Sequence, residues 1–385
     1  MNKKFNFELT KTLLMHLKKK IKFIVDKLPK TIKLYVYFFI KCHYKAKTLN
    51  KKTHNLLFNK SFFYEHFKIK KSRMPLPYFV HFEPTTRCNL SCVFCTRGTL
   101  SPENLKTDID LDLVKHLIKS NPNILMIKIQ GLGEPLMAKN FPELVSYIHE
   151  KGISMETFTN GTTLKKNKNH REILLKYFSD VFISIDSINQ ENADKLREGS
   201  KINDILQGLE TLVNERNNSK SKLKIKVNMV LSLLNYKEVK EVIEKMNAIG
   251  VDAIGLHEMD NLKTPEDPDW LKNHIEVIQF RERRKDVLAT LSEINPNNYN
   301  SEIYNLEQQQ SSHYKGNCDW GFYRTFITAN GHLTPCCKRM EDNQKITINP
   351  LNENFSELWN NEDFINFRKS HLHNLRNSLC DYCPN

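Results

Sequence analysis

The chain has 385 residues, 39% of them hydrophobic and 10% aromatic, which is enough for a folded core and two or three domains. Its net charge of +14 is concentrated in residues 1–72, which hold 19 Lys and Arg against three acidic residues, so residues 73–385 are close to neutral. Charge confined to one arm does not indicate a nucleic-acid-binding body. No recognisable nucleic-acid motif accompanies the arm, and no nucleic acid partner is expected.

The N-terminal arm, residues 1–74, is predicted to form basic helices. Apolar residues recur at spacings of three and four from Leu9 to Leu28, and a second apolar run, Leu34–Ile40, is too short to span a bilayer. The arm also lacks the cleavage site of a signal peptide. Two interpretations stay open: helices that pack on the body, or an interfacial anchor on an anionic membrane surface. We expect a cytoplasmic protein. If the arm is an interfacial anchor, the protein would lie at the inner face of the membrane.

The cysteines indicate the chemistry of the chain. All nine except Cys42 fall into two clusters, a pattern typical of metal ligands in a reducing compartment and not of a secreted disulfide framework. The first cluster, Cys88, Cys92 and Cys95, follows the apolar run Tyr78–Phe82. Three thiolates favour an iron–sulfur cluster, zinc or Cu(I). A [4Fe–4S] cluster takes four ligands, so this loop would leave one iron open, whereas a zinc knuckle would need only the last two cysteines.

Residues 75–260 alternate β-type and helical patterns. The predicted strands are Tyr78–Phe82, Ile124–Gln130, Ser154–Thr159, Val181–Ile185, Lys224–Leu231 and Ala253–Leu256. The predicted helices are Leu111–Lys119, Phe141–Lys151, Arg171–Tyr177, Lys201–Glu215 and Tyr236–Ile249. Six successive βα units predict an α/β fold, a partial (β/α)6 TIM-like barrel, with a doubly wound sheet as the alternative. Either fold places the active site at the carboxyl ends of the strands, where the cysteine loop begins.

The spacing Cys-x3-Cys-x2-Cys, with Phe94 before the third cysteine, resembles the signature of radical S-adenosylmethionine (SAM) enzymes. In that family, the open iron of a [4Fe–4S] cluster chelates the amino and carboxylate groups of SAM. The resemblance implies that Cys88, Cys92 and Cys95 hold this cluster. It also implies a one-electron reductant of flavodoxin or ferredoxin type, and cleavage of SAM to a 5′-deoxyadenosyl radical that removes hydrogen from a substrate.

Motifs at the later strand ends extend this resemblance. Gly131-Leu132-Gly133-Glu134-Pro135 is similar to the Gly-Gly-Glu motif of the family, although Leu132 interrupts the glycine pair, and Thr157–Gly161 is similar to its Thr-Asn-Gly segment. Ser184-x-Asp186 follows the fourth strand, and Arg197 stands where related enzymes pair an arginine with the carboxylate of SAM. The implied SAM-binding residues are Gly133, Glu134, Asn160, Ser184, Asp186, Arg197, Asn228 for the ribose, and the backbone near Leu256 for the adenine. No catalytic residue is assignable beyond the cluster.

The tail carries the second cysteine cluster. Residues 261–316 are predicted to form a bridging helix, Trp270–Leu291, and a linker, followed by a hairpin of Phe322–Thr328 and Leu333–Cys336. Residues 317–385 resemble the auxiliary iron–sulfur domain called SPASM, or its shorter relative twitch. Five cysteines instead of seven imply one auxiliary [4Fe–4S] cluster, with structural zinc as the alternative. The implied ligands are Cys318, Cys336, Cys380 and Cys383, and the sequence does not decide whether Cys337 replaces Cys336.

The resemblance leaves the substrate open. A fully ligated auxiliary cluster cannot bind substrate directly, so electron transfer, and hence net oxidation, is favoured over an isomerisation that recycles SAM. We expect oxidation or rearrangement of a small polar molecule, sugar-like or lipid-linked. A ribosomally made peptide is the alternative, but the arm lacks the strands of the winged-helix module that many peptide maturases carry. An alternative of a different functional class is a noncatalytic iron–sulfur or zinc protein, which would cleave no SAM.

Overall fold

The computed structural model describes residues 60–66, 68–258, 284–304, 318–337, 354–373 and 375. The chain divides into two compact units, Met1–Phe63 and Tyr64–Asn385. The predicted arm helices, residues 270–283 of the bridging helix, and Cys42, Cys380 and Cys383 lie outside the described residues. Among the residues that are described, no helix is long and apolar enough to cross a membrane.

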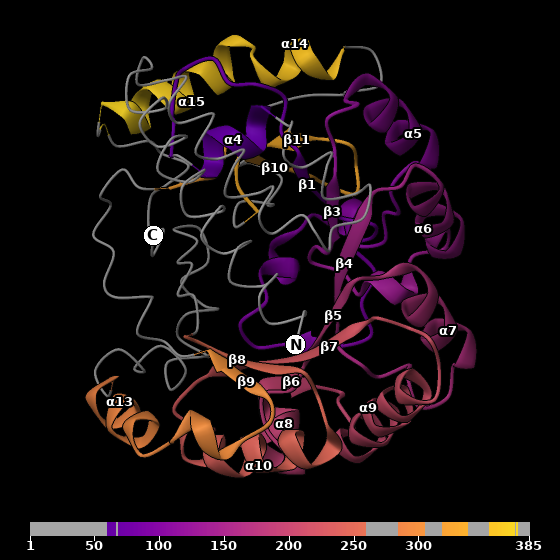
Figure 1. Ribbon diagram of the computed structural model, residues 1–385, viewed down its shortest axis with the longest axis vertical. Coiled ribbons are helices and arrows are strands. Elements are labelled where there is room, and N and C mark those ends of the chain that lie inside the picture. Colours follow the sequence, from indigo (N-terminus) through magenta and orange to yellow (C-terminus); the bar gives the residue numbers. More distant parts are fainter. Residues whose placement is uncertain are drawn as a thin grey trace, which may run out of the picture. The chain divides into compact units, whose positions relative to one another are not determined.

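A nine-stranded sheet organises the second unit (Figure 1). The order of its strands is β11-β10-β1-β3-β4-β5-β7-β8-β9, and every neighbouring pair is parallel except β10 and β11. The strands are β1 (Phe79–Phe82), β3 (Met126–Ile129), β4 (Ser154–Thr159), β5 (Asp180–Ser184), β7 (Lys224–Leu231), β8 (Ala253–Glu258), β9 (Glu302–Tyr304), β10 (Arg324–Ile327) and β11 (Leu333–Thr334).

This strand order confirms the predicted α/β fold. The six predicted strands lie side by side in chain order, as in a TIM-like barrel and unlike a doubly wound sheet, whose strand order reverses at a switch point. The described strands do not close into a barrel, because β9 and β11 form the two edges. Strand β9 was not anticipated: it lies beside β8, in a stretch expected to be linker.

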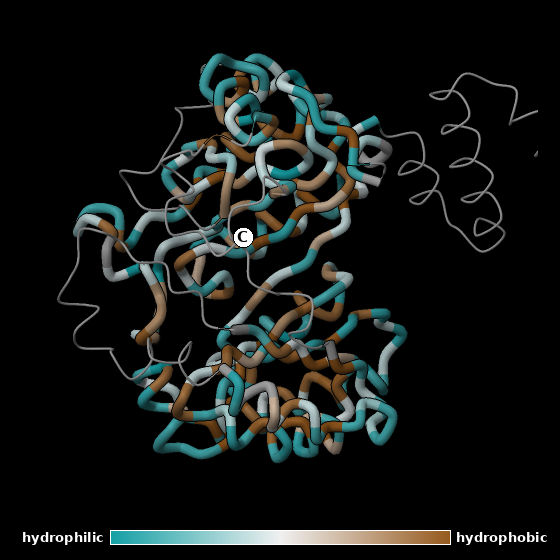
Figure 2. The backbone as a smooth tube through the Cα atoms, turned by 90° about the vertical axis from the view of Figure 1, so that its left-hand side faces the viewer, coloured by the Kyte–Doolittle hydropathy of each residue, from teal (hydrophilic) through white to brown (hydrophobic). Residues whose placement is uncertain are grey.

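Helices cover one face of the curved sheet (Figure 1). Those following the core strands are α5 (Leu111–Ser120), α6 (Phe141–Glu150), α7 (Lys168–Tyr177), α9 (Ile202–Asn217) and α10 (Val239–Ile249), close to the predicted ranges. Figure 2 colours the hydrophobic stretches of the chain brown. Alternate strand residues, such as Ile127, Met155, Val181 and Ile225, are fully buried and form one hydrophobic core with the apolar stripes of these helices. The intervening strand residues therefore face away from the helices, into the concave side.

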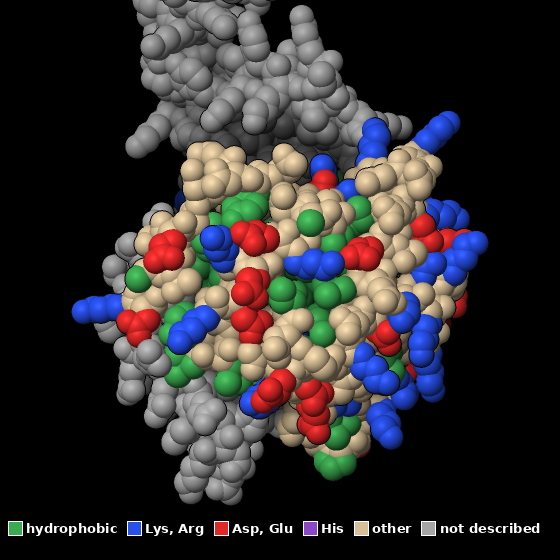
Figure 3. Space-filling model, turned by 90° about the horizontal axis from the view of Figure 1, so that it is seen from below, with side chains coloured by type: hydrophobic (Ala, Val, Ile, Leu, Met, Phe, Trp, Pro, Cys, Tyr) green, Lys and Arg blue, Asp and Glu red, His purple; other side chains and the backbone are tan. Residues whose placement is uncertain are grey.

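The other α-helices among the described residues are α4 (Lys60–His66), α8 (Gln190–Leu196), α13 (Arg284–Ser292), α14 (Phe355–Trp359) and α15 (Glu362–Leu372). The surface turned downward in Figure 1 intersperses Lys and Arg with Asp and Glu (Figure 3), as expected for a nearly neutral body.

The C-terminal hairpin belongs to the same sheet as the barrel strands. Strand β10 pairs with β1 along its whole length, from Phe79 opposite Arg324 to Phe82 opposite Ile327. The buried guanidinium of Arg368 on α15 donates to the carbonyl oxygen of Gly321, 2.6 Å away, just before β10. Residues far apart in the sequence are thereby fixed beside the first barrel strand.

Candidate iron–sulfur and SAM site

The three cysteines of the first cluster lie on the loop that follows β1, and all are partly exposed. A short ribbon forms within this loop, where β2 (Ser91–Cys92) pairs antiparallel with β6 (Arg197–Glu198) and places Cys92 opposite Arg197. The sulfur of Cys95 accepts a bond from the N–H of Arg97, 3.5 Å away, at the start of the 3-10 helix η2 (Thr96–Thr99). The cysteine loop is therefore held by hydrogen bonds although it contains almost no regular structure.

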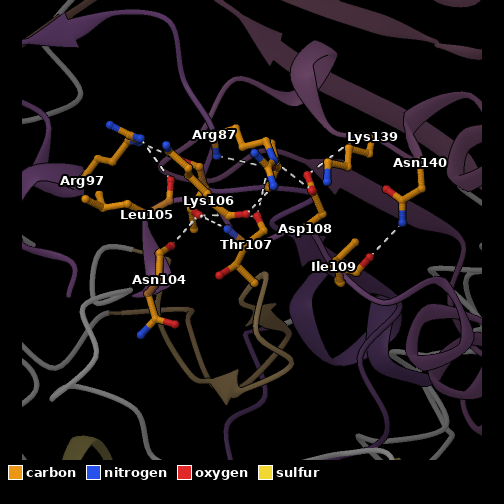
Figure 4. A network of polar contacts seen from close by, with 12 residues as sticks. Arg87, Arg97, Asn104, Leu105, Lys106, Thr107, Asp108, Ile109, Lys139 and Asn140 are labelled. Carbon is orange, nitrogen blue, oxygen red and sulfur yellow. Dashed lines mark hydrogen bonds and ion pairs between the residues drawn. The ribbon is translucent and has the colours of Figure 1, made fainter. Parts of the chain in front are cut away.

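Two arginines beside the cysteines tie this loop to the segment before α5 (Figure 4). The Arg87 guanidinium pairs with Asp108 at 2.9 Å. The Arg97 guanidinium donates to the carbonyl oxygens of Thr86 at 2.6 Å and Leu105 at 3.1 Å. Burial acts to raise the pKa of Asp108, but the bond from Arg87 lowers it below its usual value. These charge-assisted bonds fix the backbone on both sides of the cysteines.

Burial disfavours the charged, metal-binding form of two of these cysteines. Burial raises the pKa of the Cys92 thiol to about 12, with Arg197 acting in the opposite direction, and burial also raises the pKa of Cys95. A thiol must lose its proton to bind metal, so a cationic centre would supply the stabilisation that burial removes. Three cysteine thiols are the donors that a [4Fe–4S] cluster takes, with each cysteine bound to a different iron, so the residues present fit such a cluster.

Glu134 and Asn160 join the ends of β3 and β4 to the cysteine loop. The buried Glu134 carboxylate accepts bonds from the hydroxyl of Thr159 and the N–H of Asn160, both at 2.7 Å, and from the N–H of Leu136 at 3.2 Å. The Asn160 amide donates to the side-chain oxygen of Asn89 at 3.0 Å and lies 4.0 Å from the sulfur of Cys88. Burial raises the pKa of Glu134 to about 6, although these donors lower it.

Both glycines of the Gly131–Glu134 loop are pressed against residues 83–87, between β1 and the first cysteine. A Cβ on Gly133 would lie 2.2 Å from the carbonyl oxygen of Thr85 and 2.7 Å from that of Arg87, and the N–H of Glu134 donates to the Arg87 carbonyl at 2.7 Å. The sequence suggested that glycine lets this backbone approach SAM. In the structure, the space that a side chain would need is taken by residues 83–87.

Alanine at Gly133 should therefore be strongly destabilising, because its Cβ would meet backbone that cannot rotate away. We expect Gly133→Ala to lower the free energy of unfolding by about 3 kcal/mol or more. Gly98→Ala, in the cysteine loop, is the matched control, since no atom lies within 4 Å of a Cβ there. Denaturant unfolding of both variants checks this, and equal stabilities would contradict it.

Arg197 and Asp186 form a buried ion pair next to Cys92. The guanidinium Nε lies 2.5 Å from the Asp186 carboxylate, and Nη1 lies 3.6 Å from the Cys92 sulfur. The other Asp186 oxygen accepts the N–H of Val230 at 2.8 Å. Burial alone would lower the pKa of Arg197, but the charge of Asp186 and the nearby sulfurs raise it. Asp186 thus holds Arg197 against the cysteine loop, with the guanidinium 5.2 Å from the ring centre of Phe94.

The remaining predicted SAM-binding residues lie on β5, β7 and β8. Ser184 is opposite Asn228 in neighbouring strands. The side-chain oxygen of Asn228 is buried, and no hydrogen-bond donor meets it among the described residues, which fits an acceptor awaiting a ligand hydroxyl. Leu256 is only 3% exposed and its side chain packs in the core, so it could meet a ligand only through its backbone.

Of the auxiliary cysteines, the structure describes Cys318 before β10 and Cys336 and Cys337 after β11, all partly exposed. The hydroxyl of Thr334 donates to the carbonyl oxygen of Cys336 at 3.1 Å. Because Cys380 and Cys383 lie outside the described residues, the ligand set, including the choice between Cys336 and Cys337, stays a prediction.

Sequence reasoning missed several residues that shape this site. Arg87 and Arg97 flank the cysteines but belong to no motif used above, and the ribbon strand β6 is too short to produce a periodic pattern. Glu83, at the end of β1, is buried although it is charged. The one sequence signal for Glu83 is its position directly after a predicted buried strand.

An open, mostly parallel sheet with a three-cysteine loop after its first strand defines an α/β protein of the TIM-like class with a candidate metal-binding site. Residues 82–246 match the family model of the Radical SAM superfamily, and residues 318–384 match SPASM, an iron–sulfur cluster-binding domain. The chain belongs to the radical SAM superfamily and carries a C-terminal SPASM domain. Its cofactors are accordingly SAM, a [4Fe–4S] cluster and auxiliary iron–sulfur; that there is one auxiliary cluster stays a prediction.

Individual relatives are distant. The chain is 24% identical to a probable GTP 3′,8-cyclase of Methanococcus maripaludis, over 69% of this chain and 87% of that protein. It is 26% identical to the antilisterial bacteriocin subtilosin biosynthesis protein AlbA of Bacillus subtilis, over 69% of this chain but only 56% of AlbA. The crystal structure of Streptococcus suis SuiB bound to S-adenosylmethionine shares the fold, with a TM-score of 0.60 and 17% identity over 89% of this chain and 84% of SuiB.

Proposed function

We propose that this radical SAM enzyme uses reductive cleavage of SAM to oxidise or rearrange a small polar molecule, with one auxiliary [4Fe–4S] cluster accepting an electron. The observation that carries the proposal is the convergence of Cys88, Cys92 and Cys95 with Glu134 and Arg197 at the carboxyl ends of the strands. A noncatalytic zinc clip would not require a buried arginine–carboxylate pair beside its cysteines.

Each group has a separate task in this proposal. When bound, the cluster and SAM together supply the 5′-deoxyadenosyl radical that removes hydrogen from the substrate. Cys88, Cys92 and Cys95 would hold the cluster. Arg197, already aimed at the cysteine loop by Asp186, would pair with the carboxylate of SAM.

Glu134 and Asn228 complete the proposed SAM site. The Glu134 carboxylate already accepts three hydrogen bonds from the protein, so we assign it the task of shaping the Gly131–Glu134 loop, whose polar groups would meet the ammonium of SAM. The side-chain oxygen of Asn228, which meets no donor in the described part of the chain, would accept a ribose hydroxyl. A flavodoxin- or ferredoxin-type reductant would supply the electron.

Polar side chains on the concave face of the sheet favour a polar substrate. Lys128 pairs with Glu156 at 2.8 Å, and Lys226 pairs with Asp180 at 2.7 Å, with all four side chains only partly buried. These positions alternate with the buried core residues, so they face the interior of the open barrel. A substrate entering there would meet paired charges, which suit a molecule rich in hydrogen-bonding groups.

An aromatic surface lies between the two ion pairs. The rings of Phe158 and Phe182 stack with their centres 4.5 Å apart and their planes at 6°. The Lys128 ammonium lies 4.8 Å from the centre of Phe158, and the Lys226 ammonium 4.9 Å from that of Phe182. The stacked rings, each with a lysine ammonium over it, place apolar ring edges beside charged groups, which suits a substrate that carries both apolar and polar groups, such as a sugar or nucleoside.

A peptide substrate is the second candidate function. It is favoured by the similarity to AlbA, a bacteriocin biosynthesis protein, together with the SPASM domain. The similarity to a GTP 3′,8-cyclase supports the small-molecule candidate in the same way.

Fractionated extract of the source organism can separate the two candidates. The reconstituted, reduced enzyme would be incubated with the small-molecule fraction and with the peptide fraction, and 5′-deoxyadenosine formed above the substrate-free background would be measured. The proposal expects stimulation by the small-molecule fraction and net consumption of SAM. Stimulation by the peptide fraction alone would replace it with the second candidate, and recycling of SAM would contradict the oxidative step.

A further inference from the structure

Glu83 is a buried carboxylate at the end of β1, between the first strand and the cysteine loop. It is 2% exposed, and each of its two oxygens accepts a bond from a backbone N–H. One oxygen accepts the N–H of Leu132 at 2.7 Å, and the other accepts the N–H of Ala329 at 2.9 Å. Leu132 belongs to the Gly131–Glu134 loop, and Ala329 to the turn between β10 and β11 of the SPASM domain.

Close packing around Glu83 restricts the conformation of its side chain. A Cβ on Gly131 would lie 2.2 Å from Cγ and 2.4 Å from Oε1 of Glu83, so glycine is required there because Glu83 fills the space. The N–H of Glu83 also donates to the carbonyl oxygen of Ile327 on β10 at 2.8 Å. Side chain and backbone are therefore both engaged with the C-terminal hairpin.

We propose that Glu83 is a positioning residue that couples the SAM-binding loop to the auxiliary-cluster hairpin. The inference rests on the proposed function, since it takes Gly131–Glu134 as the loop that meets SAM. The hairpin is flanked by Cys318 and Cys336, so an auxiliary cluster bound there would order the turn that contains Ala329. The two bonds of Glu83 link the conformation of this turn to that of Leu132. The affinity for SAM therefore depends on whether the auxiliary cluster is bound. The coupling is reciprocal, as linkage requires.

The first test compares the affinity of the reconstituted holoenzyme for SAM in two variants. Glu83→Gln keeps the size of the side chain but turns an amide nitrogen toward a backbone N–H, and Gly131→Ala displaces the carboxylate. We expect each to weaken SAM binding about tenfold, the factor set by loss of one charge-assisted bond. The addition of SAM should shift the electron paramagnetic resonance (EPR) signal of the reduced cluster. We expect this shift to differ between each variant and the unmutated enzyme.

Asp252→Asn is the matched control. The Asp252 carboxylate also accepts a backbone N–H, that of Ile225 at 2.8 Å, but at the amino end of β8. This variant should lose stability while keeping the affinity for SAM.

The second test asks whether the effect passes through the hairpin. Cys318→Ala should weaken SAM binding, and adding Glu83→Gln to it should cost less than about twofold more, because the coupling is already broken. Fully additive effects would overturn the proposal, as would a Glu83→Gln enzyme that melts earlier but binds SAM normally. If the unmutated enzyme failed to bind SAM, the proposed function itself would fall; if it binds SAM and Glu83→Gln changes nothing, only this inference falls.

Discussion

Alanine in place of Cys92 should abolish reductive cleavage of SAM. Cys92 sits in the ribbon opposite Arg197, and with Cys88 and Cys95 it forms the whole cysteine set of this loop. A cluster left with two protein ligands cannot be retained. Even mutation of a residue that only hydrogen-bonds to a metal ligand typically lowers metal affinity or activity about 10–100-fold. We expect a loss of more than about 100-fold in 5′-deoxyadenosine formation, and loss of the iron of one cluster.

Cys42→Ala is the control for this experiment, because Cys42 lies outside both cysteine clusters. It should keep both the iron content and the cleavage of SAM. Iron analysis and product quantification on the two anaerobically reconstituted variants provide the comparison. A Cys92→Ala enzyme that still cleaves SAM would remove the loop from the mechanism.

Arg197→Ala should lose both stability and SAM affinity. The Asp186 side chain is 1% exposed and would be left buried without its counter-charge, which costs about 3–5 kcal/mol. Arg197→Lys restores a charge but not the fork that spans Asp186 and Cys92, so we expect it to recover part of the stability and little SAM binding. Urea unfolding and equilibrium binding of SAM measure the two effects.

A double variant separates the structural role of Arg197 from its proposed role in binding. Arg197→Ala combined with Asp186→Asn removes both charges, so stability should recover while SAM affinity stays low. Lys195→Ala on α8 is the control, since its pair with Glu191 is largely exposed and should contribute less than about 1 kcal/mol. Recovery of SAM affinity in the double variant would show that Arg197 does not itself contact SAM.

Periodic patterns made most of the barrel predictable from the sequence. Strands such as Lys224–Leu231 alternate between the core and the concave face, and helices such as Leu111–Ser120 carry a clear apolar stripe. Strand β9 has only three residues and lies in a polar stretch, so no periodicity marks it. The pairing of β10 with β1 is a contact between distant segments, which local patterns do not contain.

The sequence motifs of the candidate site could be predicted, but the hydrogen-bond partners of its residues could not. Cys88, Cys92 and Cys95 stand out by spacing alone. The partners of Glu134 and Asp186 depend on which loops the fold brings together: Thr159 and Asn160 for one, Arg197 and Val230 for the other. That both carboxylates contact SAM stays a prediction, and in the structure both accept hydrogen bonds from neighbouring protein groups.

Reductive cleavage of SAM at the cysteine loop is tested most directly by quantifying 5′-deoxyadenosine and methionine after dithionite reduction of the anaerobically reconstituted chain. We predict that both products form in equal amounts and that Cys88→Ala forms neither. Intact SAM in the presence of a fully loaded, reduced cluster would contradict this reaction and identify a noncatalytic iron–sulfur protein.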